Sequence, residues 1–139
     1  MINKEDILIE CIERLDNYED ASKALSKLMY INPLMAKVIA KQILENKRGD
    51  VFFRASAFDT LYALDINEAY RYTCDFIDSI EIYLLGVIIG NVTSDSSLLK
   101  ENKTIELFVD LLKQHLSVLS PSDLYEIKED LDWFRETYL

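Results

Sequence analysis

The stretch YLLGVIIGNV, Tyr83 to Val92, decides the fold, because it is almost wholly apolar and carries two glycines four residues apart. The apolar run that contains it, residues 80–92, is well short of the ~20 residues that a membrane helix needs. Two interpretations remain. The stretch is either a helix covered by other helices or a buried strand, which the Val-Ile-Ile of residues 87–89 favours.

The rest of the chain favours the helix. Only three glycines and two prolines occur in 139 residues, which leaves little turn chemistry for hairpins. A strand at residues 83–92 would therefore find no second strand with which to pair. We expect an all-α fold in which Gly86 and Gly90 share one helix face and allow another helix to approach closely.

Apolar residues recur at three- and four-residue steps along most of the chain, for example at Leu8, Cys11, Ile12 and Leu15. Pro33 and Pro121 each follow a capping residue, and Gly49 suits the left-handed position after a helix end. A polar turn is expected at residues 93–97. The pattern predicts eight helices, the later ones at residues 33–46, 51–64, 67–78, 83–92, 104–116 and 121–138.

An internal repeat is indicated by Asn32, Asn67 and Asn102, which stand 35 residues apart. The third and seventh positions after these asparagines are apolar in every copy: Met35 and Ile39, Tyr70 and Cys74, Ile105 and Val109. The fourth and eighth positions form a more polar face: Ala36 and Ala40, Arg71 and Asp75, Glu106 and Asp110. In the preceding helices a small residue stands four before another small or apolar one: Ala21 and Leu25, Ala57 and Leu61, Gly86 and Gly90.

This helical-pair pattern, above all the segment RASAFDTL from Arg54 to Leu61, resembles the HEAT-type repeats of α-solenoids. The resemblance covers residues 18–116. It implies a short right-handed α-solenoid of antiparallel helix pairs, a single domain over residues 1–139, with capping helices at 3–16 and 121–138. The period is nearer to that of tetratricopeptide repeats, but the Trp, Gly and Tyr signature of those repeats is absent.

Catalytic and cofactor chemistry is not indicated. Cys11 and Cys74 have no neighbouring ligand at metal-binding spacing, and His115 lies near a predicted helix end without a nucleophile or carboxylate motif. No glycine falls in a phosphate-binding loop. We therefore expect no enzyme, cofactor or metal. An enzyme would have to reveal itself as a pocket with converging, desolvated acids.

The net charge is −10 with a pI near 4.5, so direct binding of nucleic acid or of an anionic membrane is disfavoured and a basic protein partner is favoured. The start, MINKEDILIECIE, lacks the pattern of a signal peptide, and we expect a cytoplasmic protein. Residues 1–49 hold eight acids and eight bases, whereas residues 50–139 hold seventeen acids and seven bases. No lysine occurs from Gly49 to Leu99, a span that carries eight of the fifteen aromatic residues.

One interpretation of this span is a solvated acidic face over an aromatic core. The other is a binding ridge, because interfaces favour Tyr and Trp, and carboxylates attract a basic partner. In helix 67–78 the inward stripe would be Tyr70, Cys74 and Ile77. The ridge would comprise Arg71, Asp75 and Asp78, flanked by Glu68 and Tyr72, and would continue through Glu106, Asp110 and Lys113. The acidic last helix, with Trp133 beside Asp130 and Asp132, is the rival surface.

A small, acidic, helical-repeat chain of this kind resembles the immunity proteins of bacterial polymorphic toxin and contact-dependent growth-inhibition systems. The resemblance rests on size, charge and repeat style. It implies binding of a cognate toxin domain, often a basic nuclease, whose active site is occluded by the acidic surface. The alternative is a scaffold or adaptor domain that holds a cellular protein or peptide through weaker, salt-tolerant contacts.

Overall fold

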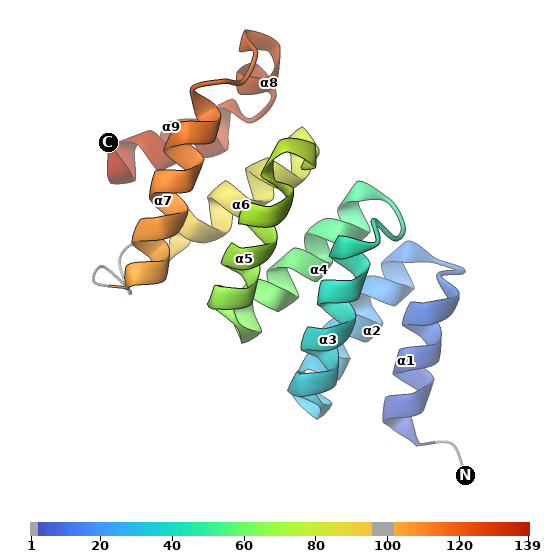
Figure 1. Ribbon diagram of the computed structural model, residues 1–139. Coiled ribbons are helices and arrows are strands. Elements are labelled where there is room, and N and C mark those ends of the chain that lie inside the picture. The colour runs from blue at the N-terminus through green and yellow to red at the C-terminus, as the bar shows by residue number, and fades with distance from the viewer. Residues whose placement is uncertain (1–2, 96–101) are drawn as a thin grey trace. The chain divides into compact units, whose positions relative to one another are not determined.

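The computed structural model describes residues 3–95 and 102–139 (Figure 1). The described residues form nine α-helices and one 3₁₀ helix and contain no strand, which confirms the all-α prediction and shows that the strand interpretation of residues 83–92 is wrong. The elements are α1 Lys4–Arg14, α2 Tyr18–Ile31, α3 Pro33–Glu45, α4 Val51–Leu64, α5 Ile66–Phe76, η1 Ile77–Ser79, α6 Ile82–Ser94, α7 Lys103–Leu116, α8 Pro121–Glu126 and α9 Lys128–Tyr138.

Asparagine, aspartate and serine side chains set most helix starts by accepting hydrogen bonds from the otherwise unpaired backbone N–H groups of the first turn. The Met35 N–H donates to Asn32 Oδ1 at 3.1 Å, with Pro33 at the first helical position, and the Asp123 N–H donates to Ser120 at 3.1 Å. Gly49 has a left-handed φ of +70°, but the left-handed residue at the end of α3 is Lys47, with φ 50°, and Gly49 instead directly precedes Asp50, the cap of α4. The predicted helix starts at Pro33 and Pro121 are confirmed.

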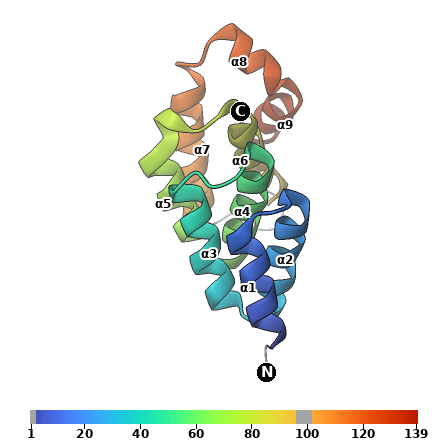
Figure 2. The same cartoon turned by 90° about the vertical axis from the view of Figure 1, so that its right-hand side faces the viewer.

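The chain divides into two compact units, Met1–Tyr72 and Thr73–Leu139. In the first unit α2 contacts α1, α3 and α4, and the short connections between these helices are visible in Figures 1 and 2. Phe53 and Phe58 of α4 are fully buried there, and the ring of Phe53 stacks on Tyr18 with centroids 6.2 Å apart. The largest other buried side chains of this unit are Ile12, Leu25, Leu28, Ile43, Leu44 and Leu61.

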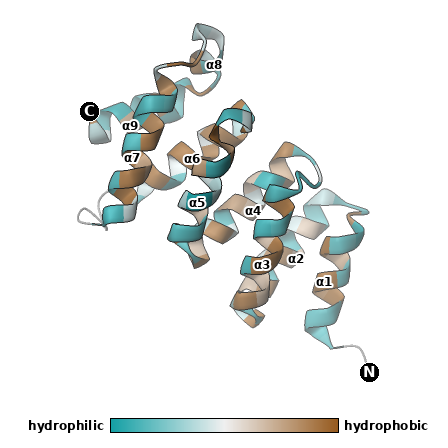
Figure 3. Ribbon diagram, viewed as in Figure 1, coloured by the Kyte–Doolittle hydropathy of each residue, from teal (hydrophilic) through white to brown (hydrophobic). Residues whose placement is uncertain are grey.

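In the second unit α6 is the central helix and contacts α7, α8 and α9. Figure 3 shows how hydrophobic α6 is along its length. Residues 83–92 belong to a core helix with neighbours on several sides, as predicted, because Leu84, Leu85, Ile88, Ile89 and Val92 are buried. The expected close approach also occurs, because Ile127 and the start of α9 pack over the glycine face.

Two predicted boundaries in this part are wrong. The last helix is broken at Ile127, whose φ of −108° and ψ of 21° separate α8 from α9. Its predicted apolar stripe is nevertheless present, since Ile127, Leu131 and Phe134 are buried. The polar turn was predicted to start at residue 93, which is too early, because α6 continues to Ser94. The buried Thr93 hydroxyl donates to the Ile89 carbonyl at 2.8 Å. Residues 96 and 97 lie outside the described part.

The repeat has a different register from the one predicted. Asn67 lies inside α5, which is capped by Asp65: the Glu68 N–H donates to Asp65 Oδ1 at 3.1 Å. Helix caps therefore recur from Asn17 to Asp50 and from Asn32 to Asp65, 33 residues in both cases. In α3 the fourth and eighth positions, Ala36 and Ala40, are buried and the third, Met35, is exposed, so the face that was counted as polar lies in the core there.

The first helices of the repeats show the corrected register. Counted from their caps Asn17, Asp50 and Glu81, the fourth, seventh, eighth and eleventh residues of α2, α4 and α6 are all buried. These residues are Ala21, Ala24, Leu25 and Leu28 in α2; Arg54, Ala57, Phe58 and Leu61 in α4; and Leu85, Ile88, Ile89 and Val92 in α6. Burial of the same four positions indicates that each of these helices turns an equivalent stripe toward its own core.

Candidate functional site

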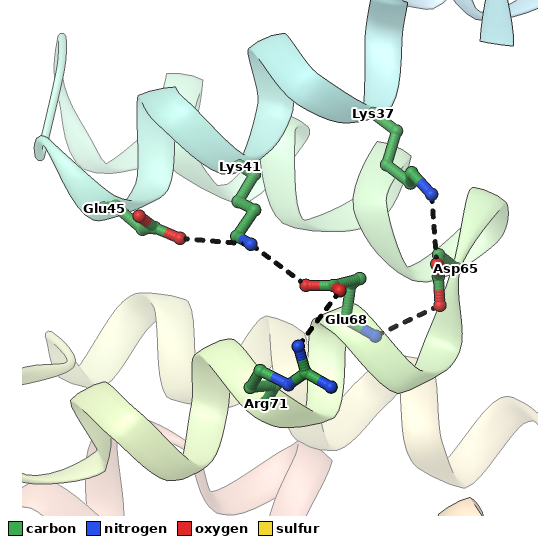
Figure 4. Close-up of polar contacts among 6 residues, drawn as sticks. All are labelled: Lys37, Lys41, Glu45, Asp65, Glu68 and Arg71. Carbon is green, nitrogen blue, oxygen red and sulfur yellow. Dashed lines mark hydrogen bonds and ion pairs between the residues drawn. The ribbon is translucent and has the colours of Figure 1, made fainter. Parts of the chain in front are cut away.

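The first half of α5 is attached to α3 by ion pairs (Figure 4). Lys37 Nζ donates to Asp65 Oδ2 at 3.2 Å, and both side chains are about one third exposed or less. Burial by itself raises the pKa of Asp65, but the hydrogen bond from the Glu68 backbone N–H and the Lys37 ammonium outweigh it, so the pKa lies below its ordinary value. Asp65 is therefore both the cap of α5 and its anchor to α3.

Glu68, the first predicted ridge residue, is neutralised within the same cluster (Figure 4). Its Oε1 lies 3.4 Å from Arg71 Nη1, and its Oε2 lies 3.2 Å from Lys41 Nζ, an ion pair without hydrogen-bond geometry. Lys41 Nζ also lies 3.8 Å from Glu45 Oε1. The basic side chains of Lys37, Lys41 and Arg71 thus pair with the carboxylates of Glu45, Asp65 and Glu68. This end of the predicted ridge is therefore electrically balanced and not acidic.

Tyr72 is buried, with 7% of its surface exposed, and its ring lies 6.3 Å from that of Phe58. Its expected position on the exposed ridge is wrong. The inward side of α5 carries Ala69, Tyr72 and Thr73, all buried, while the predicted inward residues Tyr70, Cys74 and Ile77 are only half-buried. The prediction failed because the register was counted from Asn67, two residues after the true cap.

The remaining predicted ridge residues belong to the second unit and are exposed. Asp75 lies in the last turn of α5 and Asp78 in η1. Glu106, Asp110 and Lys113 follow one another on α7 at helical spacing, opposite the buried Ile105, Val109 and Leu112. Within the described residues none of these four carboxylates takes part in an ion pair.

The rival surface on α9 is likewise exposed. Trp133 has 47% of its surface exposed, and Glu129, Asp132 and Glu136 are exposed around the buried Leu131 and Phe134. Large exposed aromatics are typical of protein-binding surfaces, and carboxylates near them attract a basic partner. Sequence patterning alone identified this surface correctly as solvent-facing.

The aromatic residues of the lysine-free span divide between core and surface. Phe53, Phe58, Tyr62 and Tyr72 are buried, so for these four the aromatic-core interpretation is confirmed and they cannot serve as interface anchors. Phe52 and Tyr83 are exposed. Only Tyr83 of these two lies in the second unit, together with the exposed carboxylates described above.

Charge is distributed very unequally between the units. Met1–Tyr72 contains twelve acids and ten bases, whereas Thr73–Leu139 contains thirteen acids and five bases, so the second unit carries −8 of the net −10. In the first unit many carboxylates have a basic partner: Glu10, Asp16, Glu19, Glu45, Asp65 and Glu68. Most of the net negative charge of the protein therefore lies in the second unit.

A hollow of about 280 Å³ lies in the second unit over the glycine face of α6. It is lined by Tyr83, Val87 and Gly90 of α6 and by Glu126 and Asp130 of the α8–α9 segment. Burial raises the pKa of the Asp130 carboxyl, and the neighbouring Glu129 charge raises it further. Sequence reasoning missed this site. The one sequence feature that could have indicated the hollow is the pair Gly86 and Gly90, which was interpreted only as a place where another helix packs.

Residues 3–95 and 102–139 also bear on metal binding, cysteine chemistry and membrane crossing. No group of three or more His, Cys, Asp and Glu side chains there is arranged to hold a metal ion. Cys11 and Cys74 are free and half-buried. Every helix in that part of the chain is too short or too polar to cross a membrane.

No protein-family model, no curated protein and no solved structure gave a significant match to the chain.

Proposed function

We propose that the chain is an immunity protein whose acidic second unit binds a basic toxin domain, most simply a nuclease, and covers its active site. The observation that carries the proposal is the charge distribution: thirteen acids against five bases in Thr73–Leu139, with the exposed carboxylates Asp75, Asp78, Glu106 and Asp110 unpaired within the described residues. The partner would be a protein that itself binds phosphates.

Carboxylates on one helix face suit such a partner. Glu106 and Asp110 are one turn apart on α7, which places their β-carbons roughly 5–6 Å from each other. A row of negative charges at this spacing can occupy cationic positions that otherwise hold phosphates of the nucleic-acid substrate. The same field would steer the two proteins together, and the rate of encounter would depend strongly on salt.

Aromatic side chains would supply the rest of the binding energy. Tyr125 on α8 is largely exposed and Trp133 on α9 is about half exposed, and both stand among carboxylates. Buried at an interface, large aromatic anchors are worth ~2 kcal/mol or more each, whereas charges at the rim contribute chiefly to encounter. The proposed surface therefore combines attraction at long range with anchors at contact.

The test is co-expression with the product of the reading frame that adjoins the gene for this chain. We expect that product to contain a basic toxin domain that arrests growth alone and is harmless when this chain is present. A variant with Asp75→Asn, Asp78→Asn, Glu106→Gln and Asp110→Asn should lose protection. A matched variant of the first unit, with Glu10→Gln, Glu13→Gln, Asp16→Asn and Glu19→Gln, removes the same charge and should protect fully. Equal protection by both variants would contradict the proposal.

A second candidate is a scaffold or adaptor role, which one observation favours. Five apolar side chains are exposed between residues 30 and 38 of the nearly neutral first unit: Tyr30, Ile31, Leu34, Met35 and Val38. A patch of this kind suits a salt-tolerant protein contact. Leu34→Asp with Val38→Asp would abolish partner binding under this alternative and would leave toxin neutralisation unchanged under the first proposal.

A further inference from the structure

The hollow over α6 exists because two residues lack side chains. A β-carbon built at Gly86 would lie 3.1 Å from Ile127 Cγ2 and 3.2 Å from Asp130 Oδ2, and one built at Gly90 would lie 3.6 Å from Asp130 Oδ1. The two glycines therefore let the Asp130 carboxylate lie close against the backbone of an apolar helix. They also leave the open volume that Tyr83 and Val87 border.

The side of α6 that lines this hollow is the one side not sealed by the core. Tyr83 is 46% exposed, and Val87 and Gly90, one and two turns further along, are partly exposed. The core helix α6 thus faces solvent along one stripe. An apolar floor with an aromatic edge suits the aliphatic stem of a long side chain.

Two carboxylates at this hollow favour the binding of a cation. Glu126 and Asp130 both line it, and neither forms an ion pair or hydrogen bond through its side chain within the described residues. A carboxylate that is partly withdrawn from water without a counter-charge is held at a free-energy disadvantage, which a positive group in the hollow would remove. The raised pKa of Asp130 reports the same disadvantage.

We propose that this hollow receives one arginine side chain of the basic partner, and this step rests on the proposed function. Its volume, about 280 Å³, is just below that of small-molecule pockets, which measure roughly 300–1,000 Å³, so it suits a single side chain. A planar guanidinium can donate to Glu126 and Asp130 together and lie against the Tyr83 ring, whereas a lysine ammonium is a compact, strongly hydrated point charge.

The test uses the free protein and three small probes: N-acetylarginine amide, N-acetyllysine amide and N-acetylcitrulline amide, the last an uncharged isostere of the first. Titrations are followed through the backbone amide signals of Gly86, Gly90 and Asp130 by NMR. We expect saturable shifts with the arginine probe at a Kd on the order of 1 mM, clearly weaker shifts with the lysine probe and none with the citrulline probe. Equal binding of the arginine and lysine probes, or binding of the citrulline probe, would overturn the proposal.

Variants distinguish the hollow from a general attraction of cations to an acidic protein. Asp130→Asn and Glu126→Gln should each weaken the arginine probe several-fold, whereas Asp132→Asn, a neighbour on α9 that does not line the hollow, should not. Gly90→Ala changes no charge but narrows the hollow and should also weaken binding. Equal effects of Asp130→Asn and Asp132→Asn would overturn the proposal. Because no partner is present, such a failure leaves the toxin-neutralisation test unaffected.

Discussion

The Asp130 carboxylate lies so close to Gly86 that a methyl group at Gly86 would meet its Oδ2 atom at 3.2 Å. The same methyl would lie 3.1 Å from Ile127 Cγ2, and Ile127 is buried. Gly86 therefore serves close packing of the α8–α9 segment on α6. Gly90, where a methyl would be 3.6 Å from its nearest neighbour, has room for a side chain.

Alanine substitutions should separate these two glycines. Gly90→Ala should stabilise the protein by about 0.5–1 kcal/mol, because alanine is the better helix former and the new methyl makes ordinary contacts. Gly86→Ala should be less stable than Gly90→Ala by about 1 kcal/mol or more, because Ile127 and Asp130 must move. Urea denaturation gives the free energy of unfolding of both variants. Equal values would contradict the close packing of Ile127 and Asp130 against Gly86.

Asp130 should make the stability depend on pH in a particular direction. Its folded-state pKa is raised, so its contribution favours folding at pH values below the unfolded value near 3.8 and is lost as the pH rises through the folded pKa. Asp130→Asn should therefore be more stable than the unmodified protein at pH 7, and the advantage should shrink as the pH falls toward 3.8. Denaturation across that range checks it. A variant that is less stable at pH 7 would mean that Asp130 has a stabilising partner.

Asp65 should make the stability depend on pH in the opposite direction. Its pKa is lowered, so its contribution is present above pH 3.8 and is lost as the pH falls through the lower folded value. At pH 7 Asp65→Ala should cost about 1 kcal/mol for the lost cap and a further increment for the lost ion pair with Lys37. Asp65→Asn keeps a capping oxygen and should cost less. Thermal denaturation that ranks the asparagine variant below the alanine variant would contradict the dual role.

The orientation of α5 can be tested with its two tyrosines. Tyr72 is buried against Phe58, whereas Tyr70 is half-buried. Tyr72→Ala should therefore lower the free energy of unfolding by about 3 kcal/mol, because it leaves a cavity in the first unit. Tyr70→Ala should cost much less. The reverse order, measured by urea denaturation, would restore the orientation that the sequence suggested.

Much of the fold was predictable because helix boundaries and burial depend on local chemistry. The scarcity of glycine and proline indicated the helical class, and caps such as Asn32 and Ser120 indicated helix starts. The glycine pair in α6 correctly indicated a close helix approach. The error at α5 came from choosing Asn67 rather than Asp65 as the cap. Both types cap well, and only the hydrogen bond to Asp65 distinguishes them.

The candidate site was less predictable because it depends on contacts between helices. Glu68 looks like a free carboxylate until Lys41 is seen beside it, 27 residues earlier in the chain. The hollow requires α8 and α9 to be placed over α6, and the break at Ile127 that brings Glu126 and Asp130 to it leaves no clear mark in the sequence. Exposure of Trp133, in contrast, followed directly from helical spacing.

The central claim, that the excess negative charge of Thr73–Leu139 recruits a basic partner, is tested most directly by the association rate constant with the basic toxin domain that the proposed function expects in the adjoining reading frame. Between ionic strengths of about 0.15 M and 0.01 M the screening length grows from roughly 8 to 30 Å, and the rate should rise at least tenfold. The variant neutralised at Asp75, Asp78, Glu106 and Asp110 should lose most of that rise, and the variant neutralised at Glu10, Glu13, Asp16 and Glu19 should keep it. A rate that does not change with salt, or that changes equally in both variants, would contradict the account.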